Sequence, residues 1–147
     1  MLTDNQTGDA GGDEVIAFLN ELLEAERAGS RVTLETARAA GVGPIADLMR
    51  TIQGDEARWC GMLLRHIKAL GAAPSPNIGA FYDKAMAIPD INERIVFLNR
   101  GQGWVVRKLR EMLPRVGDGA LHADLSEMLR SHETNIALAD EVARGGR

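Results

Sequence analysis

The chain has 147 residues, of which 45% are hydrophobic and 26% are charged, and its formal net charge is −4. This length and composition predict one soluble domain with a sizeable core. The acidic balance argues against a nucleic-acid partner and against a polybasic membrane anchor. Aromatic residues make up only 4% of the chain, which favours an aliphatic helical core over a sheet.

The same sequence predicts a cytoplasmic protein. Its single cysteine, Cys60, leaves no partner for a disulfide within the chain. The N-terminal residues lack the basic and apolar regions of a signal peptide. No apolar run approaches the roughly 20 residues that a membrane span needs, so we expect no membrane association.

The N-terminal half begins with a polar segment and continues as a helix. Residues 1–12 are rich in Gly, Asp, Asn and Thr, and we expect them to form a flexible N-terminal segment. Residues 13–147 are expected to form the single domain. Its first helix is predicted from an N-cap at Asp13 to Gly41, because apolar residues recur at helical spacing between them.

Proline and glycine positions predict the next elements. Pro44 fits the first turn of a second helix, which continues to Gly71. Prolines then interrupt regular structure, although residues 78–87 are expected to form one short helix. A third helix begins after a capping-box-like Asp90 and ends at Pro114.

A fourth helix carries apolar residues at helical spacing from Leu121 to Val142. The connections after the first and third helices are short, which predicts antiparallel neighbours. The connection of residues 71–90 is long enough to cross the whole molecule. The predicted fold class is therefore all-α, an up-down-down-up four-helix bundle with a long crossover that contains a short helix.

Each of the four apolar stripes contains a polar interruption near its middle. The interruptions are Glu26, Glu56, Gln102 and the adjacent pair His132 and Glu133. In the predicted topology they lie about 10 to 14 residues from one end, a spread of ~6 Å or one helical turn. A buried carboxylate is costly unless it is paired, protonated or bound to a metal. The sequence thus predicts a polar layer in the core.

The chain resembles the ferritin-like superfamily, especially its rubrerythrin-type members, between about Asp13 and Ala143. The resemblance rests on the topology and on the segments LLEAERAGSRVTLETA, GDEARWCGMLL and SHETNIAL. The chain is also similar to a small group of uncharacterised bacterial proteins known only as a domain of unknown function. Metal-binding ferritin-like proteins take one Glu from each of two helices and a Glu-x-x-His pair from each of the other two.

The resemblance implies that Glu26, Glu56 and Glu133 stand at three of the family's metal-ligand positions. The other positions have changed. Trp59 and Ile136 stand where histidines are expected, and Gln102 stands where the third helix should carry a glutamate. A full di-iron centre is therefore not expected, because two metal ions need several anionic oxygens and the imidazoles.

Two interpretations of this layer follow. The favoured one is a degenerate site without a cofactor, in which the carboxylates form hydrogen bonds to one another, to Gln102, to Trp59 Nε1 or to an arginine such as Arg100 or Arg107. The alternative is a single divalent ion (Fe, Mn or Zn) held by Glu26, Glu56, Glu133 and His132, with His132 facing inward instead of Glu133 or together with it. Asp55 and Arg58 are expected to be the solvated flank of this site.

The corresponding functions are a non-catalytic ferritin-like protein with a structural, stress-related or interaction role, or else a metal-binding protein or metal-dependent oxidoreductase. The sequence favours a protein that is not an enzyme. A third hypothesis is a small-ligand binder that uses the polar layer as the floor of its pocket, with the ligand unidentified. Trp104, Val106 and Leu113 lie outside the main stripe of the third helix, so we expect either the crossover segment or a second subunit to cover them, and we favour a homodimer.

Overall fold

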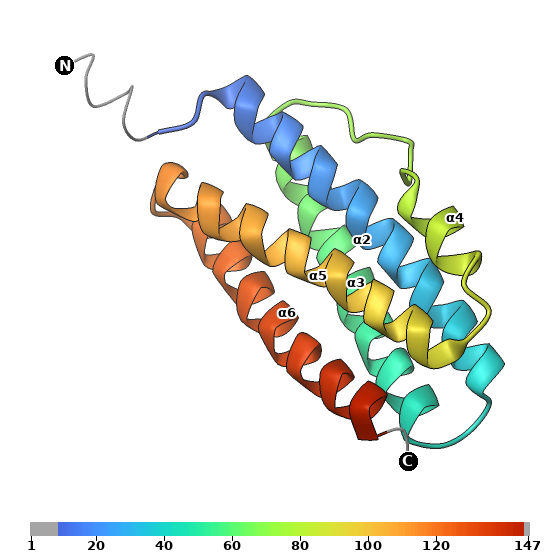
Figure 1. The fold of residues 1–147 in the computed structure, drawn as a ribbon. Coiled ribbons are helices and arrows are strands. Elements are labelled where there is room, and N and C mark those ends of the chain that lie inside the picture. The colour runs from blue at the N-terminus through green and yellow to red at the C-terminus, as the bar shows by residue number, and fades with distance from the viewer. Residues whose placement is uncertain (1–8, 146–147) are drawn as a thin grey trace.

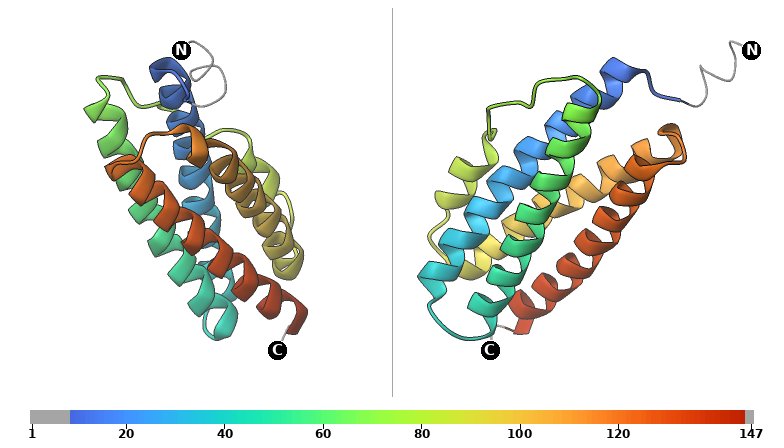
Figure 2. Two further views of the ribbon diagram at one scale, coloured as in Figure 1. Left: turned by 90° about the vertical axis from the view of Figure 1, so that its left-hand side faces the viewer. Right: turned by 180° about the vertical axis from the view of Figure 1, so that it is seen from behind.

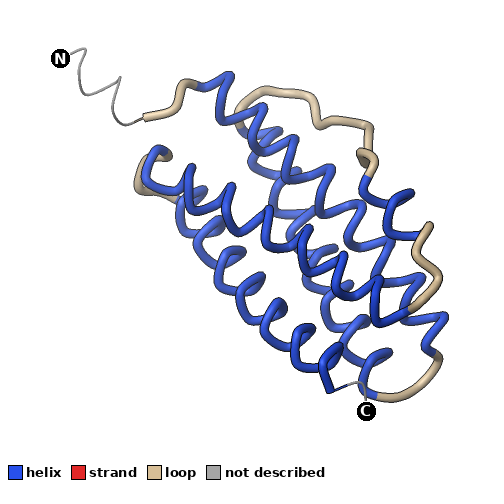
Figure 3. Tube along the Cα trace, in the orientation of Figure 1, coloured by secondary structure: helices blue, strands red, loops and turns tan. Residues whose placement is uncertain are grey.

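Five α-helices and one 3₁₀ turn make up the regular structure of residues 9–145, the part of the chain that the computed structural model describes (Figure 1). These residues contain no strand, which confirms the all-α prediction (Figure 3). The four long helices are α2 (Gly12–Ala40), α3 (Pro44–Ala69), α5 (Ile91–Met112) and α6 (Ala120–Gly145). The short elements are α4 (Phe81–Met86) and the 3₁₀ turn η1 (Leu113–Arg115).

Several helix ends follow the local sequence signals, but the predicted N-cap at Asp13 is wrong, because α2 begins at Gly12 and Asp13 lies in its first turn. Gly41 ends α2 with φ of 77°, a left-handed conformation that favours glycine. Asp90 caps α5, because its Oδ2 accepts a hydrogen bond from the Glu93 N–H at 2.9 Å. The short helix α4 begins later than predicted, at Phe81. Gly79 also has φ of 77°, and a helix cannot continue through that conformation.

The four long helices lie side by side and form two antiparallel hairpins (Figures 1 and 2). Helix α2 packs against α3, and α5 packs against α6. Further contacts join α2 to α5 and α3 to α6, so the four helices enclose one interior. The segment between α3 and α5 runs the length of the molecule, and α3 and α5 therefore point in the same direction (Figure 1).

The interior contains two apolar clusters separated by a polar layer. The first cluster holds Phe18, Leu19, Leu22, Leu23, Trp59, Met62, Leu63, Ile67, Val105, Leu109, Met112, Val116, Leu125 and Met128. The second holds Val32, Ala37, Met49, Ile52, Ala85, Ile95, Leu98 and Ala139. On every long helix at least one buried polar residue lies between the two clusters, and four of these residues form the polar layer: Glu26, Glu56, Gln102 and His132.

The crossover segment, residues 71–90, packs against α2 and α5. The Phe81 and Phe97 rings stack with their centroids 5.0 Å apart. Gly101 allows this approach, because a Cβ atom there would lie 2.7 Å from the Phe81 ring. Upstream of α4, the guanidinium of Arg27 donates hydrogen bonds to the backbone carbonyls of Ser75 and Asn77. The crossover is therefore packed against the helices rather than separate from them.

The N-terminal segment tests one prediction in part. Most of the segment 1–12, expected to be flexible, lies outside the described residues, but the Ala10 N–H donates to the Arg115 carbonyl at 2.9 Å.

None of the helices within residues 9–145 combines the length and the apolar character that crossing a membrane requires.

Candidate metal centre

Glu26, Glu56 and His132 meet in the middle of the polar layer, each from a different helix. Their exposed fractions are 1%, 3% and 1%. His132 Nε2 lies 3.0 Å from Glu26 Oε2 and 4.0 Å from Glu56 Oε2. One ligand atom from each residue can be chosen so that all three lie within 4.8 Å of one another. Side chains at this spacing can bind one small cation between them.

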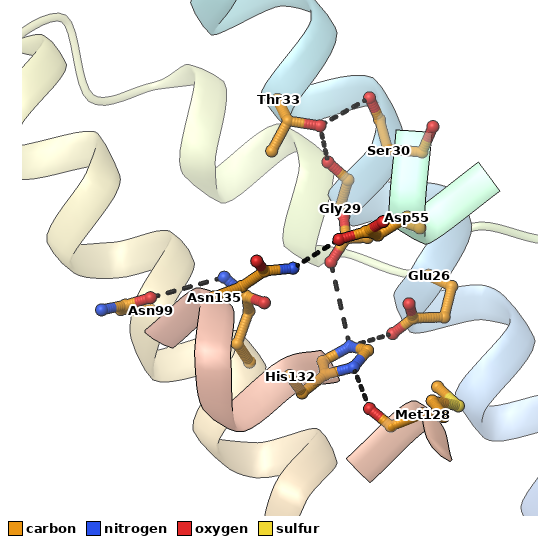
Figure 4. A network of polar contacts seen from close by, with 11 residues as sticks. Glu26, Gly29, Ser30, Thr33, Asp55, Asn99, Met128, His132 and Asn135 are labelled. Carbon is orange, nitrogen blue, oxygen red and sulfur yellow. Dashed lines mark hydrogen bonds and ion pairs between the residues drawn. The ribbon is translucent and has the colours of Figure 1, made fainter. Parts of the chain in front are cut away.

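The backbone of α6 determines which nitrogen of His132 faces the carboxylates. His132 Nδ1 lies 2.9 Å from the Met128 carbonyl oxygen (Figure 4). A carbonyl can only accept a hydrogen bond, so Nδ1 carries a hydrogen and Nε2 faces Glu26. Histidines that bind metals commonly donate their other ring N–H to a backbone carbonyl in this way. Nε2 is thus free either to bind a metal or to carry a second proton.

The pKa values of Glu56 and His132 are consistent with a cluster that binds either a metal ion or additional protons. Burial, followed by the negative charges of Glu26 and Asp55, raises the pKa of Glu56 well above its ordinary value of 4.5. Burial lowers the pKa of His132, but the charge of Glu26 and the hydrogen bonds outweigh it, so the pKa lies above the ordinary 6.5. Without a metal, the cluster therefore holds extra protons in place of the missing positive charge.

Two carboxylate oxygens in the cluster have no hydrogen-bond donor among the described residues. They are Glu26 Oε1 and Glu56 Oε1, and both are buried. Buried polar atoms of proteins nearly always have a partner, so an unpaired pair of carboxylate oxygens needs an explanation. A bound cation would supply the missing positive charge to both.

The distances fit one divalent ion after small shifts of the side chains. Ligand atoms about 2.1 Å from a tetrahedral ion are ~3.4 Å from one another. The distances from His132 Nε2 to the two carboxylate oxygens, 3.0 and 4.0 Å, lie on either side of that value. Oxygen and imidazole donors suit Zn²⁺, Fe²⁺ and Mn²⁺. The three residues therefore fit a single ion.

A cavity of about 300 Å³ reaches the cluster from the side of the crossover. Glu26, Glu56 and Gln102 lie on its polar side, and its other walls come from α2, α5 and residues 78–81. The Oε1 atom of Gln102 is a further buried oxygen without a partner among the described residues. An ion held by the cluster would therefore face a space large enough for a small molecule.

Gly29 on α2 makes room for the Glu56 carboxylate. A Cβ atom at position 29 would lie 2.3 Å from Glu56 Oε1, far inside van der Waals contact. Gly54 on α3 is exposed, and a Cβ atom there would have no heavy atom within 4 Å. The two glycines therefore form a matched pair for substitution, one inside the site and one outside it.

We expect Gly29→Ala to lower the free energy of unfolding by about 1–3 kcal/mol, because the new methyl group pushes the Glu56 carboxylate out of its position. Gly54→Ala should instead raise it by about 0.5–1 kcal/mol, because alanine favours the helix and meets no obstacle. Urea denaturation of both variants measures the two effects. Equal gains in the two variants would show that the Glu56 carboxylate is not confined.

The structure distinguishes between His132 and Glu133, the two adjacent residues predicted as ligands. Glu133 is exposed and forms an ion pair with Arg110, so the expectation that it faces the interior is wrong. His132 follows the buried residues Leu125 and Met128 at helical spacing, whereas the next position is rotated by about 100° towards solvent. His132 alone carries the cluster on α6.

The other two members predicted for the polar layer, Gln102 and Trp59, are both buried. Gln102 Nε2 donates to Asn99 Oδ1 at 3.4 Å, and not to a glutamate. Trp59 Nε1 has no hydrogen-bond partner within residues 9–145. Arg58 is exposed and lies over the Trp59 ring, 4.5 Å from its centroid. The predicted hydrogen bonds from Gln102 and Trp59 to the carboxylates are thus not formed.

Asn135 is a residue of this region that the sequence did not indicate. It is buried on α6, and its Nδ2 donates to Asp55 Oδ2 at 3.0 Å (Figure 4). Asp55 is only half exposed and is therefore more than a solvated flank. Asn135 follows His132 by three residues, on the same face of α6, and this spacing is the signal that could have identified it.

Cys60 lies beside the cluster but is a poor candidate nucleophile. Burial, with the charges of Glu26 and Glu56 adding to it, raises the pKa of the thiol to about 12. The thiolate is the reactive form of cysteine, and a thiol with this pKa is almost entirely protonated at neutral pH. The chemistry of the centre therefore rests on its carboxylates and imidazole.

Comparison with known proteins identifies a family but no function. No curated protein shows significant similarity to the chain. No solved structure matches it either. Residues 13–141 match the model of a family described as a domain of unknown function, DUF6306. Since this match covers nearly all of the described structure, the chain belongs to the DUF6306 family.

Proposed function

We propose that this protein binds a single divalent first-row transition-metal ion through Glu26, Glu56 and His132. The observation that carries the proposal is the convergence of three metal-ligating side chains from three helices within 4.8 Å, all buried. The unpaired Oε1 atoms of both glutamates support it. So does the orientation of His132, whose Nδ1–H is held by the Met128 carbonyl.

The ligand set supports one ion rather than two. A di-metal centre of the ferritin-like type uses four carboxylates and two histidines. Here two carboxylates and one histidine converge from α2, α3 and α6. The remaining long helix, α5, contributes Gln102 to the layer. The order of the helices and the single long crossover support a ferritin-like arrangement. We propose such an arrangement with a mononuclear site.

Three protein ligands leave coordination positions for a further molecule. Catalytic zinc sites have this pattern, whereas structural zinc sites have four protein ligands. A bound ion would act as a Lewis acid towards a small molecule in the cavity. Glu26, Glu56 and His132 would hold the ion, and the cavity walls would keep bulk water away from it. A metal-dependent activity on a small molecule is thus the enzymatic form of this proposal.

The competing hypothesis is a metal-free polar layer with a structural or stress-related role. Elemental analysis of protein purified without a chelator distinguishes the two, with about one ion per chain expected from our proposal. We also expect Zn²⁺, Mn²⁺ or Fe²⁺ to raise the free energy of unfolding of the metal-free protein, prepared by treatment with a chelator that is then removed. The expected gain is about 2.7 kcal/mol at a metal concentration one hundred times Kd. Thermal denaturation measures this gain.

The gain should disappear in Glu56→Gln, which keeps the shape of the side chain but weakens the ligand. Glu133→Gln is the matched control, because Glu133 is exposed and lies outside the cluster. Stabilisation by metal that is equal in both variants would place the ion elsewhere on the protein. No stabilisation in the parent protein would favour the metal-free layer.

Two further expectations stay predictions. The first is the cytoplasmic location. The second is the homodimer, which was expected to bury Trp104, Val106 and Leu113. Val106 is already buried within the chain, and Trp104 and Leu113 are half-buried. Analytical ultracentrifugation would test the dimer directly.

A further inference from the structure

Three buried oxygen atoms without a hydrogen-bond partner lie at the floor of the cavity beside the polar layer. Glu26 Oε1, Glu56 Oε1 and Gln102 Oε1 are buried, have no hydrogen-bond partner among the described residues, and belong to residues that line the cavity. The exposed fractions of the three residues are at most 3%. A ligand that complements this floor must therefore bring hydrogen-bond donors.

The charge around the cavity has a single sign. Glu21 and Glu24 line it towards the surface, and Glu26 and Glu56 line it at the floor. None of the described lining residues is Lys, Arg or His. Glu24 accepts a hydrogen bond from Ser75 Oγ at 2.6 Å, which fixes its carboxylate beside the crossover. Such a cavity attracts cations and repels anions.

The walls between these two polar ends are apolar and partly aromatic. They include Ala25 on α2, Phe81 on the crossover, and Leu98, Trp104 and Val105 on α5. The volume of about 300 Å³ is at the lower limit of small-molecule sites. A ligand for this space has a small apolar body, and an aromatic ring would find partners in Phe81 and Trp104.

From these three features we infer that the cavity binds a small organic ammonium ion, a primary amine with a short apolar or aromatic body. Its ammonium group donates hydrogen bonds to Glu26, Glu56 and Gln102 at the floor. Its apolar body lies between Phe81 and Trp104. An ammonium group has three donors and no acceptor, which matches three unpaired acceptors. Hydrogen bonds between charged partners are also the stronger class.

This inference concerns the same cluster as the metal proposal but does not rest on it. An ammonium ion and a divalent cation would both take the place of the protons that the metal-free cluster holds at the two glutamates. They therefore compete, and each should weaken the binding of the other by the same factor. Failure of the metal proposal would leave the binding of amine to the metal-free protein unaffected.

The test is isothermal titration calorimetry of the whole chain after removal of metal by a chelator, at pH 7. The probes are benzylamine, benzyl alcohol and benzoate, which share a ring and differ in charge and in donors. We expect benzylamine to bind at least tenfold more tightly than benzyl alcohol, and benzoate not to bind. Equal binding of the alcohol and the amine, or preference for benzoate, would overturn the inference.

Two variants locate the site. Gln102→Leu removes one acceptor at similar volume and should weaken binding of benzylamine about tenfold. Ala25→Leu fills the cavity and should abolish it, whereas Ala57→Leu, at an exposed position on α3, should leave it unchanged. Circular dichroism verifies that each variant is folded. Binding that survives Ala25→Leu unchanged would show that the amine binds outside this cavity, and the inference would be wrong.

Discussion

His132→Leu is expected to destabilise the metal-free protein by about 3–5 kcal/mol. The substitution removes the partner of Glu26 and leaves a carboxylate of 1% exposure among apolar side chains. The free energy of unfolding of a typical domain is only about 5–15 kcal/mol, so the loss is a large part of the total. Urea denaturation at pH 7 in the presence of a chelator measures it.

A second substitution separates the lost ion pair from lost packing. In the double variant Glu26→Gln/His132→Leu the unpaired carboxylate of Glu26 is gone, and we expect most of the lost stability to return. The single variant Glu26→Gln should cost less than His132→Leu, because a neutral imidazole is tolerated in the core more easily than an unpaired carboxylate. If the double variant is as unstable as His132→Leu alone, the loss comes from packing and Glu26 is not the reason.

The stability of the metal-free protein should fall as the pH rises above about 4.5. The pKa of Glu56 is raised well above 4.5 in the folded protein, mainly by burial. The folded state therefore holds a proton that the unfolded state releases first. Relative to acid solution, stability is lost from pH 4.5 upward until the pH passes the folded pKa, by about 1.4 kcal/mol for every unit between the two pKa values.

Deprotonation of His132 also lowers the stability of the folded protein, but in a higher pH range. Its folded pKa also lies above the ordinary 6.5, so its contribution is complete below pH 6.5 and is lost as the pH rises through the folded pKa. Glu56→Gln should remove the first part of this dependence and keep the second. Thermal denaturation between pH 4.5 and 9 compares the two proteins. A parallel pH dependence in parent and variant would show that Glu56 is ionised in the folded state.

The sequence predicts the helices and most of the polar layer, but only part of the cluster. Glu26, Glu56 and Gln102 each interrupt a regular apolar stripe, and stripe periodicity is a strong signal. His132 and Glu133 are adjacent, and one residue changes the direction of a side chain by about 100°. Both are polar, so composition cannot choose between them. The choice depends on the rotation of α6 about its axis, which packing against α5 and α3 sets.

The sequence also does not predict which side chains pack closely against Gly101 and Gly29. Nothing in the sequence pattern identifies Phe81 as the side chain that fills the space beside Gly101. The same holds for Gly29 and Glu56, which lie on different helices. Contacts of this kind depend on how two helices face each other in three dimensions. The cavity depends on them too, because Phe81 and α5 form part of its wall.

The polar layer also fixes how far each long helix can slide along its neighbours. A shift of one helix by a single turn, ~5.4 Å, would move its polar residue into one of the two apolar clusters. The displaced Glu26 or Glu56 would then lose its partners and lie against leucine or isoleucine side chains. An entirely apolar interior would tolerate such a shift far better. The residues that weaken the core thus give the four helices a single axial alignment, as buried polar residues do in some coiled coils.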